Sequence, residues 1–159
     1  MTEVERILQE YDRAMMGNAW HGEPVWTILD GITPECAAYG GTFEQHSIWQ
    51  LVMHMNYWEE VATRRMKGPV VADENLNFPN TPESTGTNWQ ATLQRFRASN
   101  RSFRDAVSRL DVNHLDDTTP GGKRTFYTDA LGVIQHHIYH AGQIALLKKI
   151  YEGSARRGL

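Results

Sequence analysis

Hydrophobic side chains recur at intervals of three and four residues in four segments of the chain, a spacing typical of amphipathic helices. The predicted helices cover about residues 2–17, 45–67, 88–110 and 128–151. Thr2, Thr87 and Thr128 stand where N-caps are expected, and Gly153 lies just past the predicted end of the fourth helix. No segment alternates hydrophobic and polar residues long enough to predict a sheet, so the pattern indicates an all-α protein.

Long connections separate the first three predicted helices. Residues 18–45 contain several glycines and prolines, which leave room only for short helical turns around PVWTILDGI and PECAAY. The polar segment 70–87 follows the helix-ending pair Gly68 and Pro69 and predicts a long loop. Four helices joined in this way predict a four-helix bundle with long connections between helices one and two and between helices two and three.

Composition and charge narrow the class of protein. A chain of 159 residues that is 40% hydrophobic is expected to form one domain, residues 1–159. The net charge of -3 gives no general attraction to nucleic acid or to a membrane surface, and we interpret the arginines of the third predicted helix as a solvent-exposed face. The charged N-terminal segment and the absence of a long apolar run favour a cytoplasmic location. Cys36 is the only cysteine, so an internal disulfide is excluded.

Three histidines fall on predicted buried faces of two helices. In the segment VIQHHIYHAGQI, His136 and His140 are one helical turn apart, about 40° around the axis, so both imidazoles can reach one point. They belong to a stripe formed by Val133, His136, His140, Ile144 and Leu147. A similar stripe on the second helix is formed by Ser47, Leu51, His54, Trp58 and Val61. His54 is therefore a third histidine directed into the predicted core.

A divalent metal ion would satisfy these three imidazoles. Burying them without partners is costly, whereas neutral imidazole is a good ligand for zinc, nickel, iron or copper. Three nitrogen ligands also leave a coordination position for water or substrate. His137 is an alternative partner for His140, but it departs from the apolar stripe and ranks second to His136.

Two segments carry a resemblance to a known family. HSIWQLVMHMNYWEE, followed by VIQHHIYHAGQIALLKK, is similar to the paired signature of the DinB-like family, also called the DinB/YfiT-like metalloenzymes. The resemblance implies an up-down-down-up bundle that binds a metal, often nickel or zinc, through His54, His136 and His140. Similar proteins are mostly described as hydrolases, some are thiol transferases, and relatives are often homodimers. The segment AWHGEPVWTILDGIT resembles an opening found in one branch, which adds His21 to the candidates.

The residues favour a nucleophile from outside the chain. The fourth helix reads HHIYH and lacks the glutamate of the HExxH protease motif, and Cys36 has no evident histidine partner in the sequence. A tri-histidine metal lowers the pKa of bound water or of a bound thiol. We therefore expect metal-dependent hydrolysis, or transfer of a low-molecular-weight thiol, on a small-molecule substrate, with zinc or nickel ahead of iron.

Other residues are candidates for lining the site. The candidate pocket residues are His21, His46, Trp58 and His137. Arg65, near the end of the second helix, is a candidate for binding an anionic substrate, with a solvent-exposed role as the alternative. The alternative to an enzyme is a non-catalytic, dimeric metal- or ligand-binding bundle. The fourth helix has a second apolar face, away from the histidines, that is available to pack on a neighbouring helix or on another subunit. It is formed by Ile134, Ile138, Ala141 and Ala145.

Overall fold

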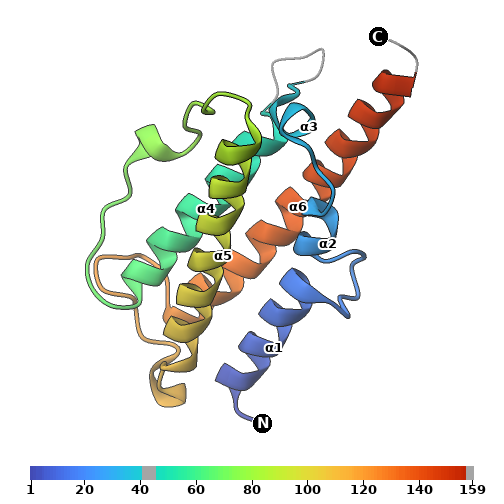
Figure 1. Cartoon of the computed structure of the whole chain (residues 1–159). Coiled ribbons are helices and arrows are strands. Elements are labelled where there is room, and N and C mark those ends of the chain that lie inside the picture. The colour runs from blue at the N-terminus through green and yellow to red at the C-terminus, as the bar shows by residue number, and fades with distance from the viewer. Residues whose placement is uncertain (41–45, 157–159) are drawn as a thin grey trace.

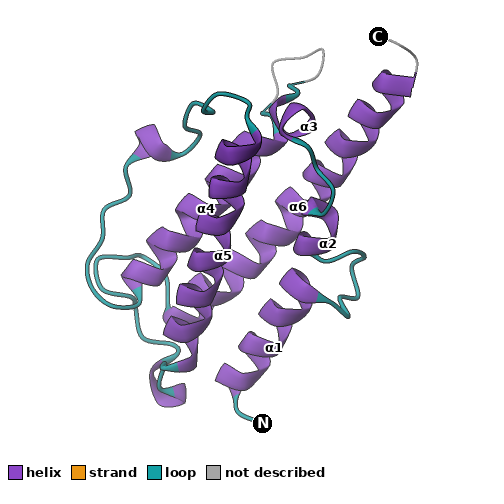
Figure 2. Cartoon of the chain, in the orientation of Figure 1, coloured by secondary structure: helices purple, strands orange, loops and turns teal. Residues whose placement is uncertain are grey.

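The computed structural model describes residues 1–40 and 46–156, and this part of the chain is all-α (Figure 2). Its six α-helices are α1 (Glu3–Met16), α2 (Val25–Leu29), α3 (Pro34–Ala38), α4 (Ile48–Arg65), α5 (Gly86–Ser108) and α6 (Phe126–Arg156). Two short 3-10 helices, η1 (Glu74–Leu76) and η2 (Val112–His114), lie in the loops on either side of α5. The described residues contain no helix long and apolar enough to cross a membrane.

The helix starts follow local capping chemistry. Thr2 caps α1 as predicted, because its side chain accepts a hydrogen bond from the Glu5 amide while Glu5 bonds back to the Thr2 amide. Ser47 and Gln50 form the same reciprocal pair at the start of α4. The predicted start of that helix included residue 45, which lies outside the described residues. The short helices α2 and α3 confirm the two turns expected between the first two long helices.

Two predicted caps and one predicted helix end are wrong. Thr85 caps α5 in place of Thr87, and α6 begins two residues before Thr128, whose amide donates to the Thr125 side chain. In each case two nearby threonines offered the same chemistry, and sequence alone does not rank them. Gly153 does not end α6, because it lacks the positive φ of a helix-ending glycine and the helix continues to Arg156.

The four long helices share one core. Helix α4 packs against α5 and α6, and α1 packs against the same two helices. Along α1 and α6 the colour sequence of Figure 1 runs in one direction, and along α4 and α5 it runs in the opposite direction. Large aromatic side chains fill the interior, among them Trp49, Trp89, Phe96 and Phe103. Burial of such rings contributes roughly 1.5–3 kcal/mol each toward folding.

The second apolar face of α6 is covered within the chain. Ile134 and Ala141 are buried, and Ile138 and Ala145 are partly buried against the core. Because α6 contacts α1, α2, α3 and α4, it is enclosed on more sides than an amphipathic stripe predicts. Of the two alternatives for this face, the structure shows packing on neighbouring helices of the same chain.

A buried carboxylate connects the four long helices. Glu59 of α4 has no solvent exposure, and it accepts hydrogen bonds from Tyr11 of α1 (2.6 Å), Asn100 of α5 (2.8 Å) and His137 of α6 (3.0 Å). Burial alone would raise the pKa of Glu59, but the hydrogen bond and charge of His137, with smaller contributions from Ser99 and Tyr11, hold that pKa below its usual value. The carboxylate is thus kept ionised in the core by one partner from each neighbouring long helix.

We expect Glu59→Gln to lower the free energy of unfolding by about 3 kcal/mol, because it removes the charge of a buried pair and leaves donors mismatched. The control Glu60→Gln removes the charge of the surface ion pair with Arg95 but keeps an amide oxygen that can accept from Asn56, and it should cost less than about 1 kcal/mol. Urea denaturation at neutral pH measures both. Since the folded-state pKa of Glu59 is lowered, its contribution is present above the unfolded pKa of about 4.3 and is lost as the pH falls through the folded value. Equal losses for the two variants would contradict this role.

Candidate metal centre

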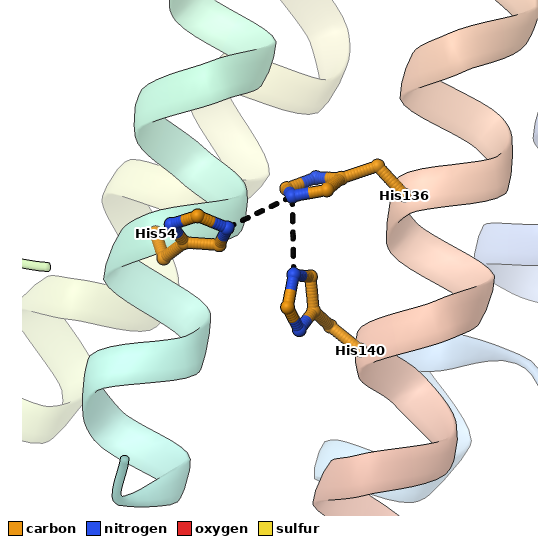
Figure 3. A group of neighbouring side chains, drawn as sticks. All are labelled: His54, His136 and His140. Carbon is orange, nitrogen blue, oxygen red and sulfur yellow. Dashed lines mark hydrogen bonds between the residues drawn. The ribbon is translucent and has the colours of Figure 1, made fainter. Parts of the chain in front are cut away.

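Three histidines from two helices meet at the contact between α4 and α6 (Figure 3). The Nε2 atom of His136 lies 2.9 Å from Nε2 of His54 and 3.1 Å from Nε2 of His140. His54 and His140 are each 6% exposed, and His136 is half-buried. Among the described residues, these three form the group of histidine, cysteine and acidic side chains that is close enough to share one metal ion.

Hydrogen bonds on the far side of two rings fix which nitrogen faces the cluster. The Nδ1 atom of His54 donates to the backbone oxygen of Asn77 (2.8 Å), and Nδ1 of His140 donates to Oε1 of Gln143 (2.6 Å). Since both oxygens accept and cannot donate, each Nδ1 carries the proton and each Nε2 presents a lone pair to the cluster. Such outer partners orient histidines that bind metals.

The donor set fits a divalent metal ion. Two Nε2 lone pairs face His136, but a neutral His136 can offer at most one N–H, so at least one of the two close contacts lacks a proton to share. A metal ion accepts all three lone pairs. Metal–nitrogen bonds of about 2.1 Å in a tetrahedral site place ligand nitrogens about 3.4 Å apart, a few tenths of an ångström from the observed separations.

Burial keeps the three imidazoles in the form that binds metals. Loss of solvent, together with the neighbouring imidazoles, lowers the pKa of His54 to about 4 and that of His136 to about 3. The pKa of His140 is lowered for the same reason. The rings are therefore neutral at pH 7, and binding a cation does not require their deprotonation.

Cavities border the cluster on two sides. The first, here the arginine cavity, has a volume of about 310 Å³, and its walls include Trp58, Arg65, Arg124, Asp129, Val133 and His136. The second, here the apolar cavity, has a volume of about 410 Å³, and its walls include His46, Phe78, Tyr139, His140, Leu146 and Ile150. Because one histidine of the cluster borders each cavity, a small molecule in either one lies beside the candidate centre.

The other candidate residues have different places. Trp58 lines the arginine cavity, and its indole donates to Oδ1 of Asn77 (2.7 Å). The His46 ring stacks on Phe78, which stacks on His54 in turn. His21 is exposed in the loop between α1 and α2 and does not belong to the cluster.

His137 belongs to the core network and not to the cluster. It is fully buried and donates to Glu59, so it neither joins His140 in place of His136 nor lines a cavity beside the cluster. The sequence interpretation placed His137 off the stripe of His136 and His140, and it left open whether the second apolar face of this helix packs within the chain. Enclosure of α6 by several helices buries a neighbouring face as well.

Several residues of the site were not anticipated. Gln143 follows His140 by three positions, and that helical spacing was an available signal. Asn77 and Phe78 lie in the loop between α4 and α5, and Arg124 lies before α6, where no periodicity predicts contacts. Tyr57, whose hydroxyl donates to the Asp73 backbone oxygen (2.9 Å), fastens the first of these loops to α4.

Neither the exposure of Cys36 nor the pKa of its thiol favours a role as a nucleophile. Its side chain is buried, and burial raises the pKa of the thiol. The structure therefore supports packing as its role.

We expect protein purified without an affinity tag or chelator to contain about one divalent metal ion per chain. The variants His54→Ala, His136→Ala and His140→Ala should each lose this ion, because two histidine nitrogens bind a cation weakly. His114→Ala is the matched control, since that histidine is exposed in η2 and bonds to Asp117. Elemental analysis by mass spectrometry gives the ratio. A full complement of metal in any of the three variants would remove that residue from the site.

We expect Gln143→Ala to weaken metal binding about 10- to 100-fold, because His140 loses the acceptor that fixes its proton and orientation. Gln143→Glu keeps an acceptor oxygen and should retain tight binding, and Gln135→Ala changes an exposed position on the same helix. Competition with a chromophoric chelator measures the three affinities. Unchanged affinity in Gln143→Ala would show that this hydrogen bond does not support the site.

Comparison with known proteins identifies the family. Searches of curated proteins and of solved structures gave no match. A family model described as the DinB superfamily matches residues 19–144, which is more than half of the chain and includes the three clustered histidines. The chain belongs to the DinB superfamily.

Proposed function

We propose that this protein is a metal-dependent enzyme that acts on a small molecule by hydrolysis or by transfer of a low-molecular-weight thiol. The observation that carries the proposal is the convergence of three Nε2 atoms, two of them with their lone pairs directed inward, between two cavities. Zinc or nickel suits three neutral imidazoles best, and iron follows. A bound divalent ion supplies Lewis acidity, which lowers the pKa of a coordinated water or thiol.

The protein's own groups hold and orient the reactants. The histidines provide three ligands from two rigid helices, while Asn77 and Gln143 keep two of the rings in a fixed tautomer. The stacked ring of Phe78 covers one face of His54. The cavities beside His136 and His140 provide room for a substrate and, in the thiol reaction, a second reactant.

The fold that supports this centre is proposed to be a single domain, an up-down-down-up four-helix bundle. The contacts of α1 and α4 with both α5 and α6 support this arrangement, as do the chain directions in Figure 1. In a bundle of this kind, side chains on facing helices build metal sites in the interior. The placement of His54 on α4 opposite the two histidines of α6 is consistent with that design.

We expect turnover only in the metal-loaded protein. The test screens small esters, amides and electrophiles, each with and without cysteine as the thiol, using protein loaded with zinc or nickel and the same protein after chelation. His140→Ala should reduce turnover at least a hundredfold, and His114→Ala should leave it unchanged, because only the first removes a ligand.

The control separates an enzyme from a binding module. Metal-loaded protein that is stabilised by compounds in the screen but turns none over would favour the non-catalytic alternative. Turnover that persists undiminished after complete metal removal would refute the proposed mechanism.

A further inference from the structure

Two arginines border the cavity next to His136. Arg65 is the last residue of α4, and Arg124 lies just before α6, so segments far apart in the sequence bring two guanidinium groups to one cavity. Trp58 and Val133 line the same cavity. It therefore combines cationic groups, an apolar wall and one histidine of the candidate metal centre.

The hydrogen-bonding capacity of Arg65 is not used within the described residues. Its Nε atom is buried and has no hydrogen-bond partner there, and no carboxylate of residues 1–40 and 46–156 pairs with Arg65 or Arg124. By contrast, five surface arginines pair with acidic side chains, namely Arg6, Arg13, Arg95, Arg104 and Arg109. Because Arg65 and Arg124 line the cavity without a carboxylate partner, their charge is available to an anionic ligand.

The charge balance of the cavity favours a ligand with one negative charge. Asp129 also borders it, is buried, and accepts a hydrogen bond from the Thr119 hydroxyl at 3.3 Å. In the metal-free protein, two guanidinium groups and one carboxylate leave a single positive charge in the cavity, which a carboxylate ligand neutralises and a phosphate dianion exceeds. The planar fork of a guanidinium group matches the two oxygens of a carboxylate.

The size of the cavity suits a small organic acid. Its volume of about 310 Å³ is at the low end for small-molecule sites, which run from about 300 Å³ upward. With a carboxylate at the arginines, the organic part of the molecule packs against Trp58 and Val133. The same molecule then extends toward His136.

We propose that the arginine cavity binds the carboxylate of a small organic acid and that Arg65 and Arg124 determine this specificity. The inference rests on the proposed function and deepens it by assigning the substrate to the carboxylic acids. It also places the carboxylate that is bound apart from the part of the substrate that reacts. Arg65 and Arg124 are binding residues in this scheme.

The test measures binding in the metal-free protein, so that it does not depend on turnover or on coordination of the ligand to a metal. The probes are butyrate, the neutral butyramide of the same shape, and butyl phosphate, and calorimetry or ligand-observed NMR gives each affinity. We expect butyrate to bind at least tenfold more tightly than butyramide and than butyl phosphate. Arg65→Gln and Arg124→Gln should each weaken butyrate binding at least tenfold.

Arg64→Gln is the matched control, because it removes the same charge from an exposed position next to Arg65 that does not border the cavity. It should leave butyrate binding unchanged. Circular dichroism and urea denaturation show whether Arg65→Gln disturbs folding. Because Arg124 is exposed, Arg124→Gln tests the proposal even in that case.

The outcomes separate this inference from the proposed function. Equal binding of butyrate and butyramide, or an equal effect of Arg64→Gln, would overturn the carboxylate site. Tighter binding of butyl phosphate would replace a carboxylic acid with a phosphate ester and also overturn it. A wild-type protein without metal would refute the proposed function alone, since the binding measurements use metal-free protein throughout.

Discussion

The buried carboxylate of Glu59 is the constraint on which the arrangement of the long helices depends. An ionised group without solvent is very unfavourable unless its lone pairs are filled, and here Tyr11, Asn100 and His137 fill them from three different helices. Hydrophobic contacts tolerate small rotations of a helix, but a hydrogen bond of 2.6–3.0 Å does not. The network therefore fixes how each long helix is turned toward the others.

The orientation of α6 carries this constraint to the candidate metal centre. Successive residues of a helix point about 100° apart, so a His137 held by Glu59 determines where His136 points, and His140 follows one turn later. On the facing helix, Glu59 and His54 are separated by little more than one turn. One core interaction thus positions the two helices that supply all three imidazoles, while Asn77 and Gln143 set the proton on the two outer rings.

The chemistry of the centre follows from what surrounds these nitrogens. Burial keeps the imidazoles neutral. The inward nitrogens then have more lone pairs than N–H groups to fill them, and a divalent cation can accept these lone pairs. The arginine cavity beside His136 and the apolar cavity beside His140 differ in charge and lining. A substrate with distinct ends can be oriented by that difference before any bond is made or broken.

The sequence by itself determined the all-α class, the approximate helices and the three clustered histidines, because hydrophobic periodicity on a helix is a local property that places His54, His136 and His140 on inward faces. Membership of the DinB superfamily was also recognisable from the two histidine-containing segments. Only the tertiary structure decided the role of His137, which lies outside the predicted stripe and is nevertheless fully buried. The reason is that the periodicity of α6 alone does not show how many helices enclose it. The same holds for Asn77, Phe78 and Arg124, whose loops have no period to interpret and acquire their partners only when distant segments pack together.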